Sequence, residues 1–302
     1  MGHTFRWGRS LSLVLGVCVL GVLMWQLGAQ DVLDRIATIG WGVAPVFLIS
    51  ILWKCNNTAA WTLAFAPNCK RPGFWRLFRA NLMGDVVSNL LPTAGLGGEV
   101  AKPYLLRSEV SVSKSLAAVV ANKTMELLSG LVFASAGVGI VLYRLPLSKP
   151  VYWGLMMAVG IGGAAIVTAC LVQRKHPFSR LIGWCDRLGI GRGRLDLKRE
   201  AMVQVDEGLS AFYRQDRRRF FGCFTLRLGS WILGTSETYF LLQLMGAEVT
   251  FLTAMLMIAL AVVIDSAFFF VPANVGTFEA GHSYVAFLLG LSPALGLSVA
   301  LV

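Results

Sequence analysis

Long apolar runs separated by short polar stretches dominate this chain. A helix needs roughly 20 mostly apolar residues to cross a hydrocarbon core of about 30 Å. Windows of about that length or longer fall near residues 11–28, 43–66, 115–143, 151–173, 220–245 and 251–271. The pattern predicts an all-α, polytopic integral membrane helical bundle, with residues 1–302 forming a single membrane domain.

Composition supports the same class. The chain is 56% hydrophobic and 14% charged, with a mean hydropathy of +0.67. A water-soluble fold of this size could not bury so much apolar surface. Arg6 and Arg9 precede the first apolar window, but "WQLGAQ" after it is a poor cleavage site. We therefore expect a retained first helix rather than a signal peptide.

The net charge of +11 is local rather than general. Residues 174–219 hold twelve of the 27 Lys and Arg residues, against six Asp and Glu. Loops rich in Lys and Arg stay cytoplasmic, so we expect the N-terminus and this basic loop on the cytoplasmic face of a bacterial inner membrane. The acidic stretch 29–42 is predicted outside. This distribution favours contact with anionic lipids over a nucleic-acid partner.

Familiar catalytic and metal-binding motifs are absent. The six cysteines show no C-x-x-C spacing, and the three histidines are scattered. No G-x-S-x-G, Walker A or H-E-x-x-H motif occurs, so hydrolase and NTPase chemistry has no signature. The sequence predicts neither a cofactor nor a metal.

A pattern D-x6-P-x6-E occurs twice, 180 positions apart. Its members are Asp85, Pro92 and Glu99 in "NLLPTAGLGGE" and the residues before it, and Asp265, Pro272 and Glu279 in "IDSAFFFVPANVGTFEAGH". The same offset matches Lys102 with His282 and Tyr104 with Tyr284. These matches predict an ancient duplication, with repeat 1 at about 43–143 and repeat 2 at about 220–302, on either side of the basic loop.

Each copy is expected to break its helix. Proline lacks an N–H and disfavours helix in the preceding residue, while glycines such as Gly95, Gly98 and Gly276 allow turns. Broken backbone at membrane depth survives only against protein or a water-filled cavity. We predict two re-entrant helical hairpins, at about 75–108 and 251–292, which enter from opposite faces as inverted repeats. The same offset predicts that the chain stops inside its last membrane helix.

Charged residues inside the apolar segments are the candidate site. Glu99 with Lys102, Lys123 with Glu126, and Glu279 with His282 are each spaced i,i+3, so each pair can meet on one helix face. They could merely neutralise each other. They could also line a polar chamber in which Lys102, Lys123 and Arg227 attract a lipid phosphate. Lys54, Asn56 and Asn57 could extend this chamber or bind neighbouring helices.

The runs "LPTAGLGGEVAKPYLL", "NKTMELLSG" and "VPANVGTFEAG" resemble the flippase-like membrane domain of lysylphosphatidylglycerol synthases. Relatives tend to carry a Glu-Arg pair where this chain has Glu126 and Leu127. The size and the lone-domain architecture resemble the free-standing, hopanoid-associated branch. The resemblance implies a lipid-translocating or lipid-handling membrane domain, without the separate domain that performs aminoacyl transfer.

Two functions remain open at this point. One is a flippase that moves an anionic phospholipid, an aminoacylated phospholipid or a hopanoid or polyprenyl-type lipid between leaflets. The other is an accessory or catalytic protein of lipid modification, with Asp85, Glu99 and His282 as acid and base. Expected partners are membrane lipids, lipid-biosynthesis enzymes and a second copy of the chain. The candidate site residues are Asp85, Pro92, Gly95, Gly98, Glu99, Lys102, Lys123, Glu126, Arg227, Asp265, Pro272, Gly276, Glu279 and His282.

Overall fold

The structure, a computed structural model, describes residues 18–19, 21–67, 69, 71–90, 96–144, 146, 148–173, 177–180, 196–214, 216–267 and 276–302. Within these ranges the regular structure is helical and contains no strand. The elements are α2 (Ala29–Ile39), the 3-10 turn η1 (Gly40–Gly42), α3 (Val43–Ala64), α4 (Phe74–Leu90), α5 (Leu96–Leu105), α6 (Val112–Arg144), α7 (Lys149–Gln173), α9 (Asp196–Arg214), α10 (Arg217–Leu244), α11 (Phe251–Ala267), α12 (Thr277–Leu288) and α13 (Pro293–Leu301).

The predicted apolar windows largely coincide with helices. Five of them correspond to α3, α6, α7, α10 and α11, and the window at 11–28 lies partly outside the described residues. Within the described part of the chain, three helical segments are long and apolar enough to cross a bilayer: Ala29–Ala64, Val112–Arg144 and Lys149–Gln173. The chain is a multi-pass helical membrane protein.

Exposed aromatic side chains lie where apolar helices begin or end. Trp41, beside the start of α3, is 94% exposed, and Tyr143, at the end of α6, is 89% exposed. Trp153 in the first turns of α7 is also exposed. Trp and Tyr are enriched at membrane–water interfaces because their rings are amphipathic. In the most apolar stretch of α7 no residue is buried, as expected for a helix that faces lipid.

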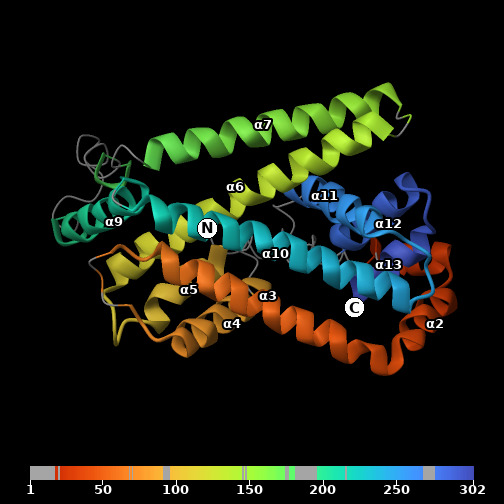
Figure 1. Cartoon of the computed structure of the whole chain (residues 1–302), viewed down its shortest axis with the longest axis horizontal. Helices are drawn as coiled ribbons and strands as arrows, with labels where there is room; N and C mark the ends of the chain where they lie inside the picture. Colours follow the sequence, from red (N-terminus) through yellow and green to blue (C-terminus); the bar gives the residue numbers. More distant parts are fainter. Residues whose placement is uncertain are drawn as a thin grey trace.

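Two long helices, α3 and α10, pack along one another through the bundle (Figure 1). At 28 residues, α10 is about 42 Å long at 1.5 Å per residue. The helix α6 packs against α9, α10 and α11, while α7 lies over the outer side of α6. The helix α9 lies at one end of the long axis, and α2, α12 and α13 lie at the other.

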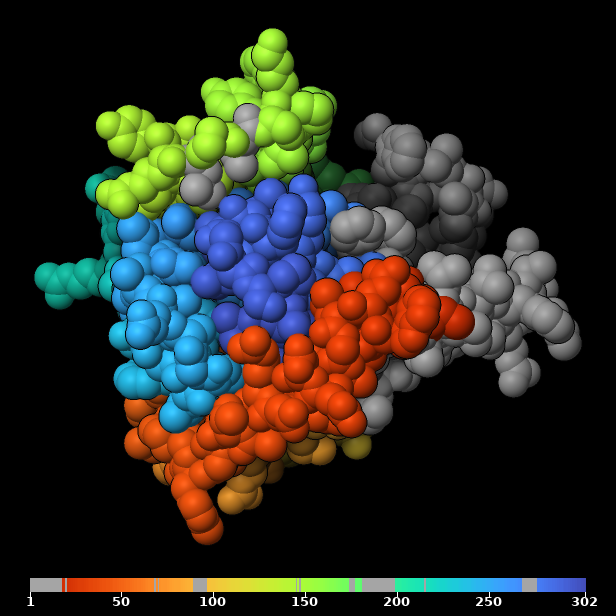
Figure 2. Space-filling view, turned by 90° about the vertical axis from the view of Figure 1, so that its right-hand side faces the viewer, coloured from red at the N-terminus to blue at the C-terminus, as the bar shows by residue number. Residues whose placement is uncertain are grey.

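The stretch 29–42, which the sequence analysis interprets only as an acidic outer segment, forms the helix α2. Val32 is fully buried and packs against Ala294 and Leu297 of α13. Figure 2 shows α2 lying against α13 at this end of the molecule. Val32, Ile36 and Ile39 recur at i, i+4 and i+7, which is the spacing of one helix face.

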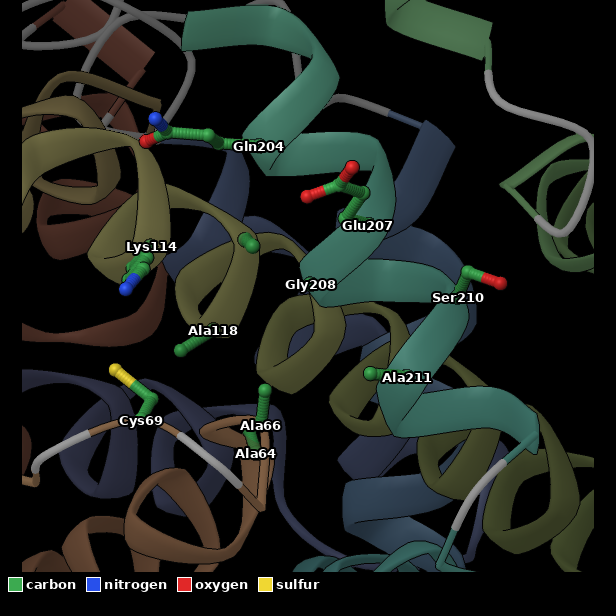
Figure 3. A pocket seen from close by; sticks show the side chains of 11 residues that line it. Ala64, Ala66, Cys69, Lys114, Ala118, Gln204, Glu207, Gly208, Ser210 and Ala211 are labelled. Atoms are coloured by element: carbon green, nitrogen blue, oxygen red, sulfur yellow. The ribbon is translucent and has the colours of Figure 1, made fainter.

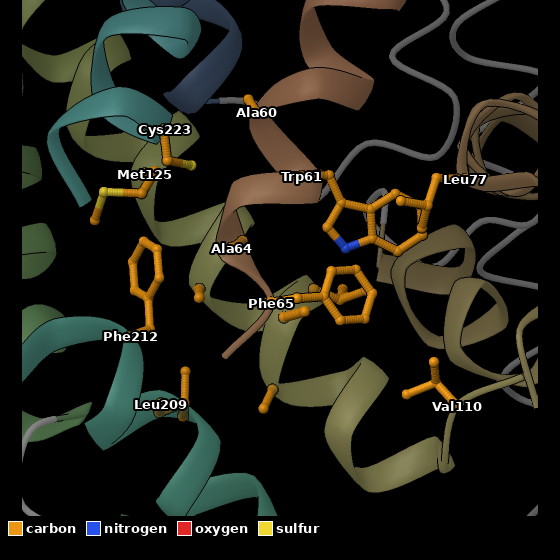
Figure 4. Close-up of a cluster of buried hydrophobic side chains, with 14 of the residues drawn as sticks. Ala60, Trp61, Ala64, Phe65, Leu77, Val110, Met125, Leu209, Phe212 and Cys223 are labelled. Carbon is orange, nitrogen blue, oxygen red and sulfur yellow. The ribbon is translucent and has the colours of Figure 1, made fainter. Parts of the chain in front are cut away.

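The buried apolar side chains form two large clusters at opposite ends of the long helices. The α9-side cluster contains Trp61, Phe65, Leu77, Met125, Leu209 and Phe212, among others (Figure 4). The α2-side cluster contains Val46, Val138, Leu241, Leu242, Met257 and Leu260, among others. Along α3, α6 and α10 the polar side chains described below lie between these two clusters, near the middle of each helix.

The helix α9 falls inside the predicted basic loop, yet it is part of the packed structure. Leu209 and Phe212 are buried in the α9-side cluster. Asp206, also buried, accepts hydrogen bonds from the backbone N–H groups of Phe178 (3.1 Å) and Ser179 (2.8 Å). A buried carboxylate needs such donors, so Asp206 ties the segment 177–180 to α9.

Candidate functional site

A polar cavity of about 650 Å³ opens between the two hydrophobic clusters. Side chains from α3, α4, α5, α6, α10, α11 and α12 surround it, so segments from both halves of the chain contribute. The lining residues are Trp53, Lys54, Asn57, Asn81, Asp85, Ser88, Glu99, Lys102, Lys123, Glu126, Arg227, Ser230, Trp231, Gly234, Glu237, Thr238, Ile258, Ala261, Val262, Asp265, Phe278 and His282.

One group of charges joins α3, α4 and α5. The ammonium of Lys102 lies 3.0 Å from Glu99 and 3.7 Å from Asp85. Asp85 also accepts a hydrogen bond from Lys54, whose Nζ is 2.7 Å away. The side chain of Lys102 is 6% exposed and that of Lys54 is 27% exposed. Lys102 is therefore a buried link between two carboxylates, while Lys54 still faces the cavity.

Two glycines allow the close contact that buries Lys102. A Cβ added to Gly98 would lie 1.9 Å from the backbone oxygen of Gly84. A Cβ added to Gly84 would lie 2.4 Å from Cε of Lys102. Only residues without a Cβ permit this approach of backbones. The predicted site residue Gly98 thus acts through the packing of α5 on α4, and it does not line the cavity.

A second group of charges joins α6 and α10. Glu126 lies 2.6 Å from Lys123 and 3.3 Å from Arg227. The buried Arg227 also donates to Asn122 (3.1 Å) and Asn57 (2.8 Å), so its guanidinium is held on several sides. The side chain of Lys123 is 37% exposed. Both cations of this group line the cavity, and Lys123 is the more exposed of the two, since the side chain of Arg227 is 8% exposed.

The two groups together contain four cations and three carboxylates. Each carboxylate, Asp85, Glu99 or Glu126, lies within ion-pair distance of at least one cation. Burying charge is tolerable when it is paired and hydrogen-bonded. The groups carry a net charge of +1, which suits an anionic ligand.

Two further carboxylates that line the cavity, Glu237 and Asp265, have no cation partner among the described residues. Glu237 accepts a hydrogen bond from Ser50 (2.6 Å). Among the described residues, no Lys, Arg or His lies within 4.0 Å of the Glu237 or Asp265 carboxylate. The cavity is therefore electrically uneven: its cations come from α3, α5, α6 and α10, and its uncompensated carboxylates from α10 and α11.

The predicted pair of Glu279 and His282 does not form. Glu279 instead accepts a hydrogen bond from the backbone N–H of Gly276 (2.7 Å), whose φ of 82° is the left-handed conformation that favours glycine. Nδ1 of His282 lies 2.9 Å from the carbonyl oxygen of Phe278. Because Gly276 is the N-cap residue of α12, Glu279 caps its own helix, whereas His282 lines the cavity.

The remaining sequence predictions divide in three ways. The pairs of Glu99 with Lys102 and of Lys123 with Glu126 are confirmed. The three residues Pro92, Gly95 and Pro272 lie outside the described residues. In α3, Lys54 and Asn57 line the cavity, while Asn56 donates to the Leu226 carbonyl oxygen (2.6 Å) and to Ser230 (2.9 Å).

Several cavity residues escaped the sequence analysis. Asn81 and Ser88 line the cavity beside Asp85, and the spacing 81, 85, 88 is the i, i+4, i+7 pattern of one helix face. This polar face of α4 could have predicted that Asn81 and Ser88 lie beside Asp85. Trp53, Ser230 and Trp231 gave no comparable signal, because only the packing of α3 on α10 brings them to the cavity.

A second pocket of about 420 Å³ lies where α9 meets the beginning of α6 (Figure 3). Its wall is mostly small: Ala64, Ala118 and Ala211 line it beside Lys114 and Glu207. The α9-side cluster contains Ala64 and Ala118 as well as Met125 farther along α6. This pocket and the charged cavity have no lining residue in common.

The fold and the cavity define a class: a polytopic helical membrane protein with a charged cavity midway along its long helices. Comparison with known proteins identifies the family. The lysylphosphatidylglycerol synthase TM region family matches residues 9–302, and the chain belongs to it.

Two curated relatives are archaeal. A UPF0104 membrane protein of Pyrococcus horikoshii is 23% identical over 315 residues, covering 96% of this chain and 90% of that protein. A UPF0104 membrane protein of Methanothermobacter thermautotrophicus is 24% identical over 260 residues, covering 80% of this chain and 75% of that protein. No solved structure matches the chain significantly.

Proposed function

We propose that this protein moves an amphiphilic lipid between membrane leaflets, with the anionic headgroup passing through the charged cavity and the tail remaining in the bilayer. The observation that carries the proposal is the pair of partly exposed lysines, Lys54 and Lys123, that face one cavity midway along the long helices. The candidate cargo is an anionic phospholipid, an aminoacylated phospholipid or a hopanoid.

Partner exchange would let a headgroup enter without leaving a charge unpaired. A phosphate that takes Lys123 leaves Glu126 with Arg227, and one that takes Lys54 leaves Asp85 with Lys102. An isolated ion in a low-dielectric medium costs on the order of tens of kcal/mol. A cavity that offers cations at mid-depth lowers this cost, which is the physical requirement for lipid flipping.

Inverted hairpins would suit alternating access to such a cavity. The bounds of the helices support the duplication: α6 and α13 begin at Val112 and Pro293, an offset of 181 positions. We propose that the N-terminus and the loop 174–219 face the cytoplasm of a bacterial cell. The basic residues of that loop support this orientation.

The test is lipid exchange in proteoliposomes. Fluorescent analogues of phosphatidylglycerol, lysylphosphatidylglycerol and a hopanoid are placed in one leaflet, and a membrane-impermeant quencher follows their movement. Lys54→Gln combined with Lys123→Gln should lower the initial rate about tenfold, equivalent to about 1.4 kcal/mol. The matched control is Arg76→Gln, which removes a cation whose partner is Glu109, outside the cavity; its rate should equal that of the wild type.

Three other outcomes would contradict the proposal. Exchange at the rate of protein-free liposomes would exclude flipping of the lipids tested. Equal rates for the double variant and the wild type would exclude a role for these lysines. Conversion of the lipid to a new species would favour a membrane enzyme.

A further inference from the structure

The two aspartates of the repeated pattern lie in different electrical surroundings. Asp85 has two lysines within ion-pair distance, whereas Asp265 has no cation within 4.0 Å among the described residues. The undescribed segment next to Asp265, residues 268–275, reads "FFFVPANV" and contains no basic residue. Both aspartates line the same cavity.

One difference between the two copies of the pattern explains why Asp265 lacks a cation partner in the described part of the chain: histidine stands at position 282, where the first copy has lysine. Lys102 lies 3.7 Å from Asp85, and the residue 180 positions after Lys102 is His282. His282 is buried, and its Nδ1 lies 2.9 Å from the Phe278 carbonyl oxygen. A histidine is largely neutral near pH 7, whereas a lysine is charged. Repeat 2 therefore has no fixed positive charge where repeat 1 has one.

Other groups around Asp265 do not supply the charge. The helix α11 packs against α6, α7, α10 and α12. From α6 and α10, Lys123 and Arg227 are both bound to Glu126, and α10 adds the acidic Glu237 to the cavity. In α7 the one charged residue is Lys149, at its first position.

The helix α12 places a negative charge, not a positive one, near Asp265. A Cβ on Gly281 would lie 3.7 Å from Oδ1 of Asp265, so the carboxyl lies against the first turns of α12. Glu279 lies in those turns and accepts a hydrogen bond from the backbone N–H of Gly276. A half-buried carboxyl in these surroundings is more stable with its proton.

We propose that Asp265 is a proton-binding site of the cavity and that lipid movement is coupled to protonation there. The coupling rests on the proposed function. In this step a proton moves from hydronium to a carboxylate oxygen of Asp265. One O–H bond forms on the carboxyl as one breaks in hydronium, which leaves water. An anionic headgroup in the cavity repels the negatively charged carboxylate form of Asp265. Binding of the headgroup therefore favours binding of a proton to Asp265. The charge of the proton offsets the charge of the headgroup. Net charge is expensive to move through the bilayer, so this pairing favours joint movement.

Proton binding can be tested without any lipid transport. Infrared spectra of the purified protein in detergent, recorded at neutral pH in H2O and D2O, report the C=O stretch of protonated carboxyl groups. We expect a protonated-carboxyl band in the wild type that is missing in Asp265→Asn and retained in Asp85→Asn, because Asp85 is paired with lysine. Identical bands in the wild type and Asp265→Asn would overturn the proposal.

Coupling is tested in the same proteoliposomes with a phosphatidylglycerol analogue. The initial rate in the wild type should rise several-fold when the side that holds the lipid is acidified from pH 8 to pH 6. Asp265→Asn, which is permanently neutral, should show no such rise. The control Glu109→Gln, a carboxylate outside the cavity, should keep it.

The two hypotheses fail in different ways. Wild-type exchange that does not depend on pH would overturn the coupling while leaving the proposed function intact. No exchange at any pH would overturn the proposed function for this lipid, and the infrared band would still decide whether Asp265 holds a proton.

Discussion

The segments α4–α5 and α11–α12 carry the same spacing of aspartate, proline and glutamate but use their charges differently. In the first, Lys102 joins Glu99 and Asp85 inside the protein. In the second, Glu279 caps its own helix and Asp265 has no basic partner among the described residues. The comparison teaches that the same spacing of carboxylates gives different contacts when lysine stands at one matching position and histidine at the other.

The largest expected effect comes from removing the buried lysine. Lys102→Met leaves the partly buried Glu99 without its cation, although Asp85 keeps Lys54. Breaking a buried ion pair on one side costs about 3 kcal/mol or more. His282→Gln at the matching position removes no ion pair and should cost less than about 1 kcal/mol. The measurement is the free energy of unfolding in detergent from denaturant titration, and equal losses would remove the distinction between the two segments.

The next effect concerns the contact between helices. Gly98→Ala places a methyl group 1.9 Å from the Gly84 carbonyl oxygen, a clash with backbone that forces α5 away from α4. Overpacking of this kind costs about 2 kcal/mol. In α12, the closest atom to the Cβ of Gly281→Ala is Cγ2 of Ile264, at 3.2 Å, a side-chain atom that can move, and the substitution should cost a few tenths of that. Thermal unfolding of the two variants, measured side by side, checks the ranking; a larger loss for Gly281→Ala would contradict it.

The smallest effect concerns Glu279. Glu279→Ala removes the side chain that accepts from the Gly276 N–H and should cost about 1 kcal/mol, the usual value of a helix cap. Glu279→Gln keeps an acceptor oxygen and should recover at least half of the loss. Amide hydrogen exchange at the start of α12 is the direct readout. Faster exchange in Glu279→Gln than in Glu279→Ala would show that Glu279 is not a cap.

The sequence was sufficient to predict what lies along one helix. Apolar windows predicted α3, α6, α7, α10 and α11, and the i,i+3 spacing predicted the ion pairs of Lys102 and Lys123. Both inferences depend only on the helical period. The same rule could have predicted the amphipathic helix α2 from Val32, Ile36 and Ile39. The acidic residues of 29–42 led only to the prediction of an outer segment.

Contacts between helices could not be predicted in this way. The pairs of Lys54 with Asp85 and of Arg227 with Glu126 depend on how each helix is rotated and which neighbour it packs against. The sequence also placed Glu279 beside His282, but the open N–H of Gly276 was the better partner. A spacing shows which contacts are possible, and the surrounding backbone decides among them.

The burial of α9 has a mechanical consequence. Leu209 and Phe212 belong to the same apolar cluster as Trp61 and Met125 of the long helices. A molecule that binds α9 and pulls it outward would have to expose this cluster to water. Force applied to α9 would therefore reach the membrane helices directly, through this cluster.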